Sequence, residues 1–375
     1  MLWLLVTLLL LLPYSLLLLL YRRWWKAVPA TRVPASFEPS TRFTVIIPAR
    51  NEAENLPLCL ASVGRLQYPA HLLEVVLVDD YSDDTTAAIA ASFPGVRVIR
   101  LGELLEGPIN SYKKKAIETG VATAAGDYIV TTDADCTVPP GWLRYFAWII
   151  EQAPTVFIAA PVAMDREDRF IRLFQSLDFL SLQGITGASV GAGFHSMSNG
   201  ANLCYSRAAF YEVGGFKDID DLASGDDMLL LHKLYQKYPE QVRYCKAPGC
   251  IVHTRPVDDV RAFFLQRIRW ASKAQRYHDR RIFWVLLLVY LVNLWLLVLL
   301  PAGLFQPWAW VVLAGALLFK TLAELWFLLP VAAFFGKRHL LPWFPLLQPH
   351  HILYTVLAGW LGQWGRYEWK GREVQ

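Results

Sequence analysis

Hydrophobic residues gather at the two ends of the chain. Leu2–Leu20 is almost wholly apolar and is followed by Arg22, Arg23 and Lys26. At about 1.5 Å per helical residue, such a run can cross a hydrocarbon core of about 30 Å. A cleaved signal peptide would carry its positive charge before the apolar run. We therefore expect an uncleaved anchor whose basic end lies on the cytoplasmic side.

Three further apolar runs lie toward the carboxyl end. Ile282–Leu300, which we expect Pro301 to stop, and Trp308–Phe335 are both long enough to span a bilayer. Ile352–Trp364 is too short to cross comfortably. We expect it to lie in the membrane interface or to re-enter the membrane from the same side.

The second of these runs contains two charged residues, Lys320 and Glu324. Charges inside a membrane are costly unless they are paired or functional. A spacing of four residues puts both on one face of a helix. We expect them to neutralise each other against a neighbouring helix.

Between the apolar ends, short apolar runs alternate with segments of helical length. The predicted strands are Phe43–Pro48, Leu73–Asp79, Val96–Leu101 and Tyr128–Thr132. The predicted helices lie near Glu54–Arg65, from Ser82 or Asp83 to Phe93, and from Ser111 onward. This alternation predicts an α/β fold with a parallel sheet. Such sheets bind ligands beyond the carboxyl ends of their strands.

Composition agrees with a membrane-bound protein. Of the 375 residues, 55% are hydrophobic and 18% are charged, whereas soluble proteins have about 45–50% and 25%. A net charge of +4 is too small to indicate nucleic acid as a partner. The five cysteines form no C-x-x-C pair, so we expect free thiols in a reducing compartment. His195 and His253 have no second ligand at metal-binding spacing, so we do not expect them to bind metal.

Acidic pairs follow two of the predicted strands. Asp79 and Asp80 close the second, and Asp133 and Asp135 follow the fourth, while P-loop and G-x-G-x-x-G signatures are absent. Carboxylates repel phosphates, so a divalent cation must lie between the two. Asp-x-Asp supplies the oxygen ligands that Mg²⁺ or Mn²⁺ prefers, although such a pair is also common in turns and caps.

Four further features accompany these acids. Ile47–Glu52 follows the first strand, Ser111–Gly120 carries three lysines, Ser224–Asp227 is an acidic turn, and Gln266–Trp270 is a Q-x-x-R-W sequence. In this order the motifs resemble the membrane-bound branch of the family 2 glycosyltransferases, which have the GT-A fold. That branch includes cellulose, chitin and hyaluronan synthases and ceramide glucosyltransferases. The resemblance covers about Arg42–Lys273.

The resemblance implies an α/β GT-A nucleotide-sugar-binding domain with a mostly parallel sheet, flanked by N- and C-terminal transmembrane helices. The predicted organisation is an anchor over residues 1–26, a linker over 27–41, a catalytic domain over 42–254, an amphipathic interface helix with Q-x-x-R-W over 255–281, and a membrane region over 282–375. That last region would hold about two crossings and the interfacial or re-entrant segment.

The resemblance also implies a nucleotide-sugar donor, with uridine as its nucleoside, and a metal cofactor. The residues that would bind the donor are Glu52, Asp79, Asp80, Lys113, Asp133, Gln266 and Arg269. Asp133 and Asp135 would hold Mg²⁺ or Mn²⁺ on the diphosphate.

Three catalytic residues are implied as well. Asp227 would be the general base, Asp226 would support it, and Arg269 would stabilise the leaving diphosphate. One base with no separate nucleophile implies inversion at the anomeric carbon. Trp270 and Asn202 would line the acceptor site. Asp226 and Asp227 could also cap the following helix, and the Q-x-x-R-W helix could also lie on an anionic membrane surface. We expect each segment to combine this structural role with its role in the site.

Two acceptors are compatible with these motifs. The few predicted crossings can hardly line a polymer channel, so we expect a membrane lipid or lipid-like alcohol at the cytoplasmic face of a bacterial inner membrane. The alternative is a processive polysaccharide synthase of the cellulose, hyaluronan or poly-N-acetylglucosamine type. A non-catalytic membrane scaffold on the same fold is a remote third reading, because all the acids are present. No pattern in the sequence indicates an oligomeric state.

Overall fold

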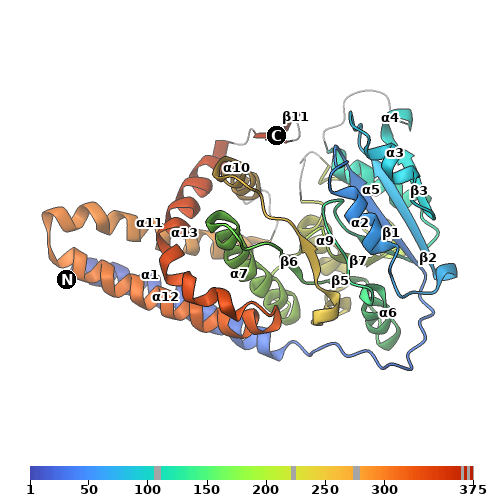
Figure 1. Cartoon of the computed structure of the whole chain (residues 1–375). Helices are drawn as coiled ribbons and strands as arrows, with labels where there is room; N and C mark the ends of the chain where they lie inside the picture. Colours follow the sequence, from blue (N-terminus) through green and yellow to red (C-terminus); the bar gives the residue numbers. More distant parts are fainter. Residues whose placement is uncertain (105–110, 221–224, 273–278, 365–366, 370–371, 375) are drawn as a thin grey trace. The chain divides into compact units, whose positions relative to one another are not determined.

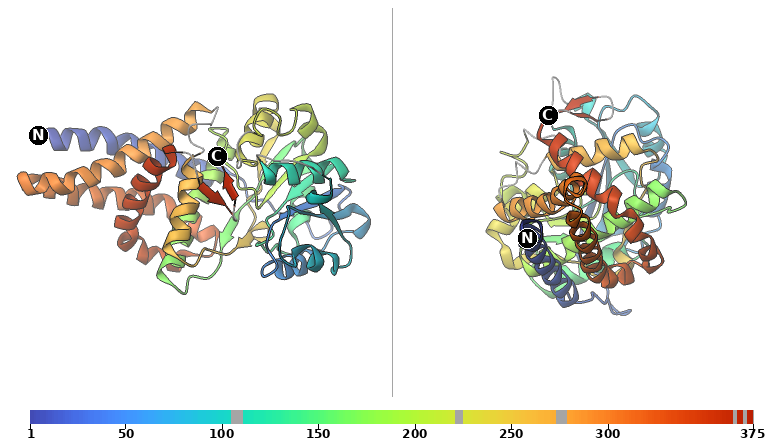
Figure 2. Two further views of the ribbon diagram at one scale, coloured as in Figure 1. Left: turned by 90° about the horizontal axis from the view of Figure 1, so that it is seen from above. Right: turned by 90° about the vertical axis from the view of Figure 1, so that its left-hand side faces the viewer.

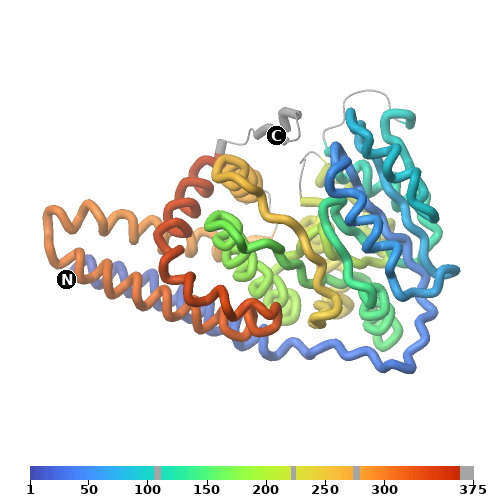
Figure 3. Tube along the Cα trace, in the orientation of Figure 1, coloured from blue at the N-terminus to red at the C-terminus, as the bar shows by residue number. Residues whose placement is uncertain are grey.

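A computed structural model describes residues 1–104, 111–220, 225–272, 279–364, 367–369 and 372–374. The chain forms two compact units. The sheet unit comprises Val28–Asp165, Ser196–Arg255 and Glu368–Gln375, and the helical unit comprises Met1–Ala27, Arg166–His195 and Pro256–Tyr367. Figure 3 traces the three stretches of the helical unit in blue, in green, and in orange to red. Ser224 and residues 273–278, which fall in the predicted acidic turn and interface segment, lie outside the described residues.

The main sheet has seven strands in the order β3-β2-β1-β4-β7-β5-β8 (Figure 1). The first four are parallel, β7 runs antiparallel to β4 and β5, and β8 is parallel to β5. This confirms the predicted mostly parallel α/β sheet. The strands are β1 (Phe43–Ala49), β2 (Leu73–Asp79), β3 (Val96–Arg100), β4 (Tyr128–Thr131), β5 (Phe157–Ala159), β7 (Leu203–Ser206) and β8 (Val242–Tyr244). Two small sheets pair β6 (Val162–Met164) with β9 (Val252–Thr254) and β10 (Tyr367–Trp369) with β11 (Arg372–Val374).

Helices cover the central strands, whose side chains are apolar on both faces. Val45, Ile47 and Leu77 are fully buried, α5 packs on β1 and β2, and α3 packs on β2 and β3. The helices of this unit are α2 (Leu56–Val63), α3 (Thr86–Ala91), α4 (Leu101–Leu104), α5 (Tyr112–Thr123), α6 (Trp142–Gln152), α8 (Arg207–Glu212) and α9 (Met228–Lys237). Helix α3 starts later than predicted because the carboxylate of Asp84 accepts a 2.9 Å hydrogen bond from the backbone N–H of Thr86.

The helical unit contains three helices long and apolar enough to cross a membrane, among the residues described (Figure 2). They are α1 (Leu2–Ala27), α11 (Arg280–Phe305) and α12 (Trp308–Phe334), as the apolar runs predict. The other helices are α7 (Phe170–Ala192), α10 (Val260–Ala271) and α13 (Phe344–Leu361). The last of these contains most of the short apolar run that we predicted not to span.

One boundary in this unit was predicted wrongly. Pro301 does not stop its helix, because α11 continues to Phe305. A proline removes one backbone donor, and membrane helices tolerate such losses when the following bonds re-form. The helix runs on past the proline to Phe305 and closes with a 2.9 Å bond from the backbone N–H of Gln306 to the carbonyl of Ala302.

Buried charges in the helical unit are paired, as expected for Lys320 and Glu324. The Nζ of Lys320 lies 2.8 Å from Oε1 of Glu324 and donates to Gln348 of α13 at 2.7 Å. Tyr14 of α1 donates its hydroxyl to Glu324. The pair is therefore neutralised against two neighbouring helices.

A glycine allows the closest approach between α7 and α12. A Cβ at Gly184 would lie 2.7 Å from Val331 and 2.9 Å from Phe327. Both contacts are shorter than real Cβ atoms make, so the two helices would have to move apart.

We expect Gly184→Val to lower the free energy of unfolding of the helical unit by about 1–3 kcal/mol, because it overpacks this contact. Gly315→Val, in α12, is the matched control because a Cβ there meets no atom within 4 Å. Thermal unfolding followed by helical circular dichroism compares the two. Equal melting temperatures would show that α7 and α12 do not depend on this contact.

Candidate functional site

The loops after β1 and β2 are bonded to each other at the carboxyl edge of the sheet. Ala49 and Asp79 are partners in register, and the backbone N–H of Asp80 donates to the carbonyl of Ala49 at 2.8 Å. The guanidinium of Arg50 donates to the carbonyls of Asp80 and Tyr81, at 2.9 and 2.6 Å. Tyr81 has the left-handed φ of 53°, a conformation that persists only where surrounding contacts hold it.

Three of the predicted donor-binding acids lie on these strand ends and loops. The backbone N–H of Glu52 donates to Thr86 Oγ1 at 2.8 Å, and its carboxylate accepts from Asn55 at 3.0 Å. Asp79 and Asp80 are buried, and Oδ1 of Asp79 has no hydrogen-bond partner in the part of the chain that the structure describes. The carboxyl edge therefore holds one acid, Asp79, with a buried oxygen that the described part of the fold leaves without a hydrogen bond.

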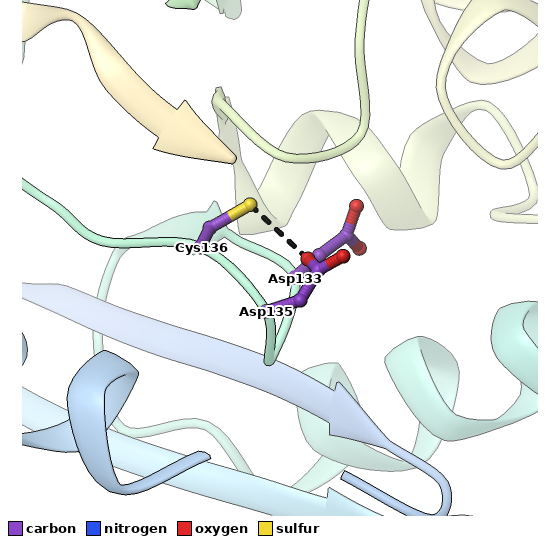
Figure 4. Close-up of side chains that lie close together, drawn as sticks. All are labelled: Asp133, Asp135 and Cys136. Carbon is purple, nitrogen blue, oxygen red and sulfur yellow. Dashed lines mark hydrogen bonds between the residues drawn. The ribbon is translucent and has the colours of Figure 1, made fainter. Parts of the chain in front are cut away.

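Asp133 and Asp135 follow β4 at the same edge. Their carboxylates and the thiol of Cys136 offer ligand atoms within 4.8 Å of one another (Figure 4). Burial raises the pKa of Cys136, so it remains a thiol, which donates to Asp135 Oδ1 at 3.4 Å. The two carboxylates are left as hard oxygen donors, a set that fits Mg²⁺ or Mn²⁺ better than a soft metal.

Lys113, from the first turn of α5, lies among carboxylates of two chain segments. Its Nζ is 2.8 Å from Asp133 Oδ1 and 3.3 Å from Asp226 Oδ2. Burial alone would lower the pKa of Lys113, but Asp133, Asp226 and Asp227 together raise that pKa above its usual value. The lysine is therefore charged at neutral pH and draws the acids after β4 and before α9 together.

Asp227 is half-buried at the start of α9. One oxygen caps the helix by accepting from the backbone N–H of Met228 at 2.7 Å, and the other accepts from the N–H of Gly200 at 3.2 Å. A Cβ at Gly200 would lie 3.0 Å from Asp226 Oδ2 and 3.2 Å from Lys113 Nζ. Only a residue without a side chain lets the backbone approach these charged groups so closely.

The buried side chain of Asn202 anchors the segment around Gly200 by hydrogen bonds. Its side chain is fully buried and donates to the carbonyls of Pro161 and Cys250, at 2.7 and 2.9 Å. It also accepts from the indole N–H of Trp142 at 2.8 Å. The amide of Asn202 therefore supports this loop, and the acceptor-lining role expected for Asn202 stays a prediction.

Sequence reasoning did not identify His253 as a neighbour of the segment that follows Asp133 and Asp135. Its backbone makes an antiparallel bridge with Thr137, two residues after Asp135, and its Nδ1 lies 2.7 Å from Asp165. The pairing of β6 with β9 brings it there, and this contact is far too long-range for spacing along the chain to reveal.

Gln266, Arg269 and Trp270 belong to the helical unit, where all three lie on α10 and are partly buried. Arg267, which no motif singled out, is buried there. The sheet unit alone brings together Lys113, Asp133, Asp135, Asp226 and Asp227. Such a cluster can bind a divalent cation and present a carboxylate base beside it.

Comparison with known proteins gives the same indication as the site. The family model "Glycosyl transferase family 2" matches residues 44–214. The undecaprenyl-phosphate 4-deoxy-4-formamido-L-arabinose transferase of Serratia proteamaculans is 33% identical over 162 residues, 41% of this chain and 47% of that protein. The poly-beta-1,6-N-acetyl-D-glucosamine synthase of Staphylococcus epidermidis is 23% identical over 224 residues, 59% of this chain and 52% of that protein. The chain thus spans about half the length of these curated relatives.

A solved structure shares the fold. A mannosyltransferase from Pyrobaculum calidifontis, in complex with GDP-Man and Mn²⁺, aligns with a TM-score of 0.55 and 21% identity, over 92% of this chain and 94% of that one. Residues 44–214 therefore match the family 2 glycosyltransferase model, and the chain shares the GT-A fold of this solved glycosyltransferase.

Proposed function

We propose that this chain transfers a sugar from a nucleotide diphosphate sugar, with UDP as the nucleotide, to a membrane lipid or lipid-like acceptor. The observation that carries the proposal is the meeting of α5, the turn after β4 and the start of α9 around Lys113. Nucleotide-sugar transfer needs a charged diphosphate to be bound and a hydroxyl to be deprotonated at one place. This cluster holds groups for both tasks.

The donor lies along the carboxyl edge of the sheet in this proposal. Asp79 and Asp80 accept hydrogen bonds from the nucleoside, and Glu52 lies beside it on the neighbouring loop. Lys113 and Arg269 counter the charge of the diphosphate, together with Gln266. The unsatisfied Oδ1 of Asp79 supports this role, because a buried acceptor without a partner is costly.

The same carboxylates fit a divalent cation. Asp133 and Asp135 would hold Mg²⁺ or Mn²⁺. Their carboxylate oxygens lie within 4.8 Å of each other and are the hard ligands that these ions prefer. When bound, the cation would act as a Lewis acid that neutralises the departing diphosphate. Lys113 supplies one positive charge beside these acids, which is less than the negative charge of a diphosphate.

Asp227 is the general base of the proposed reaction. Its carboxylate accepts the proton of the acceptor hydroxyl while that oxygen bonds to the anomeric carbon and the bond to the diphosphate breaks. A single displacement of this kind inverts the anomeric centre. The bonds from Met228 and Gly200 fix the carboxylate, while Asp226, paired with Lys113, keeps a second negative charge compensated beside it.

A lipid acceptor is favoured over a growing polymer. The described residues contain three helices able to cross a membrane, few for enclosing a polysaccharide channel. The name of the Serratia relative specifies undecaprenyl phosphate as its lipid. The Staphylococcus relative supports a processive synthase as the second candidate. The basic residues at the C-terminal end of α1 favour a site at the cytoplasmic face of the membrane, with Trp270 of α10 beside the acceptor.

We expect membranes containing the wild-type chain to move label from a radiolabelled nucleotide sugar into the organic phase. A panel of donors, with Mg²⁺ or Mn²⁺, is partitioned between solvent, water and a filter. Asp227→Asn should lower the transfer rate about 100-fold or more, because the base is lost. Asp127→Asn is the control, since this exposed acid precedes β4 at the opposite edge of the sheet. Label retained as an enzyme-digestible solid would favour the synthase, and equal rates for Asp227→Asn and wild type would exclude Asp227 as the base.

Chelation of divalent cations should abolish transfer, and Mg²⁺ or Mn²⁺ should restore it. Asp135→Asn should weaken Mn²⁺ binding to the purified chain by about tenfold or more, because one ligand oxygen is lost. Titration calorimetry measures this binding without turnover. Full activity in the presence of a chelator would contradict the metal site.

We expect Lys113→Met to lower the free energy of unfolding of the sheet unit by about 3 kcal/mol, because it removes the cation that pairs with the buried carboxylate of Asp226. Lys115→Met is the matched control on the same helix, where an exposed pair with Glu118 is worth under about 1 kcal/mol. The five free cysteines are all buried in the sheet unit, so their reactivity with a thiol dye follows its unfolding. Adding Asp226→Asn should recover part of the loss; no recovery would mean that Lys113 is not stabilised by this pair.

A further inference from the structure

Arg267 occupies an unusual position for an arginine in a helix that carries a substrate-binding motif. It is 4% exposed on α10, and its Nη2 lies 2.8 Å from Oδ2 of Asp178 on α7. Asp178 is buried as well and accepts a hydrogen bond from the hydroxyl of Tyr354 on α13. The ion pair therefore joins α10 to α7 at a point that α13 also holds.

The same guanidinium contacts two residues of the Q-x-x-R-W motif. Its Nη1 donates to Oε1 of Gln266 at 3.1 Å. Its carbon lies 4.2 Å from the ring centre of Trp270 and 4.7 Å from that of Phe263. A flat cation between two rings is held by their negative faces, so Arg267 links both motif side chains to Asp178.

Helix geometry explains what this contact controls. At about 100° per residue, Phe263 and Trp270 lie on the same side of α10 as Arg267, four residues before it and three after it. Gln266, Arg269 and Trp270 share the adjoining face, because they are three and four residues apart. A rotation of α10 about its axis would carry that face away while separating Arg267 from Asp178.

We propose that Arg267 is a positioning residue which, through its ion pair with Asp178, fixes the rotation of α10 and the orientation of Gln266 and Trp270. The inference rests on the proposed function, in which these two side chains contact donor and acceptor. Arg267 itself touches neither substrate. Lysine would not replace it fully, because an ammonium group cannot pair with Asp178, bond to Gln266 and stack on Trp270 together.

Steady-state kinetics of the full chain in lipid nanodiscs tests the proposal. R267Q should lower kcat about 100-fold, since small misplacements of substrate-orienting groups cost rates of this order, while the donor KM changes far less. D178N should have a similar effect, and the R267Q/D178N double variant should be no worse than either single one. R267K should recover part of kcat.

E324Q is the matched control for stability. It also removes charge from a buried, paired acid of the helical unit, but the described partners of Glu324, namely Tyr14, Lys320 and Gln348, lie outside α10. We expect a comparable fall in melting temperature with kcat within about twofold of wild type. Equal kcat losses for R267Q and E324Q at equal loss of stability would reduce Arg267 to a structural ion pair and overturn the proposal.

A readout without turnover separates this inference from the proposed function. With 5-fluorotryptophan incorporated, the ¹⁹F resonance of Trp270 is assigned by its loss in W270F. R267Q and D178N should shift or broaden it, and E324Q should leave it in place. An unchanged resonance in R267Q overturns the inference even if transfer is observed. A wild-type chain that transfers no sugar, but whose resonance moves in R267Q, refutes the proposed function while leaving the positioning of Trp270 supported.

Discussion

Carboxylates gathered at one edge of a sheet repel one another, and the sheet unit can hold its acids there only because a cation lies among them. Lys113 meets Asp133 after β4 and Asp226 before α9. Its charge is retained because the attraction of these acids outweighs the cost of burial. Two chain segments that are distant in sequence are therefore joined by one ammonium group, and Gly200 leaves the space for it. The loops of the site take their positions from this electrostatic contact as much as from the sheet.

In the helical unit, too, buried charges need partners of opposite sign, and a charge without a partner is more costly there. A lone charge in a poorly polarisable interior is far more costly than a pair, so buried charges survive there as pairs. Lys320 with Glu324 and Arg267 with Asp178 satisfy this rule. Pairing has a consequence that apolar packing lacks, because an ion pair joins particular atoms and so fixes the rotation of a helix. Apolar contacts between α7 and α12 leave such rotations less strongly determined, apart from the close approach at Gly184.

Much of the fold could be predicted because its signals are local. Apolar runs identified the three candidate membrane helices and the four parallel strands, with ends correct to within a few residues. Asp79, Asp80, Asp133 and Asp135 could be predicted from their place at strand ends, whereas Asp226 and Asp227 were identified through the family resemblance. Asn202 and His253 show where local signals stop: Asn202 accepts a hydrogen bond from the indole of Trp142, and His253 forms a bridge with Thr137, which lies far from it in the sequence. Pro301 was misjudged because a membrane helix can continue past a proline, as α11 does to Phe305. Arg267 could not be found at all, since its partner Asp178 lies on another helix.

The charge balance at the sheet edge also limits how a donor can bind under the proposed function. Lys113 contributes one positive charge against Asp133 and Asp226, with Asp227 close by, so the cluster is already negative without a ligand. A diphosphate adds further negative charge, and repulsion at this range in a partly buried site is worth several kcal/mol. Lysine alone therefore cannot attract the donor. A divalent cation on Asp133 and Asp135 reverses the local sign, which is the physical reason for a second acid beside the one that Lys113 already compensates.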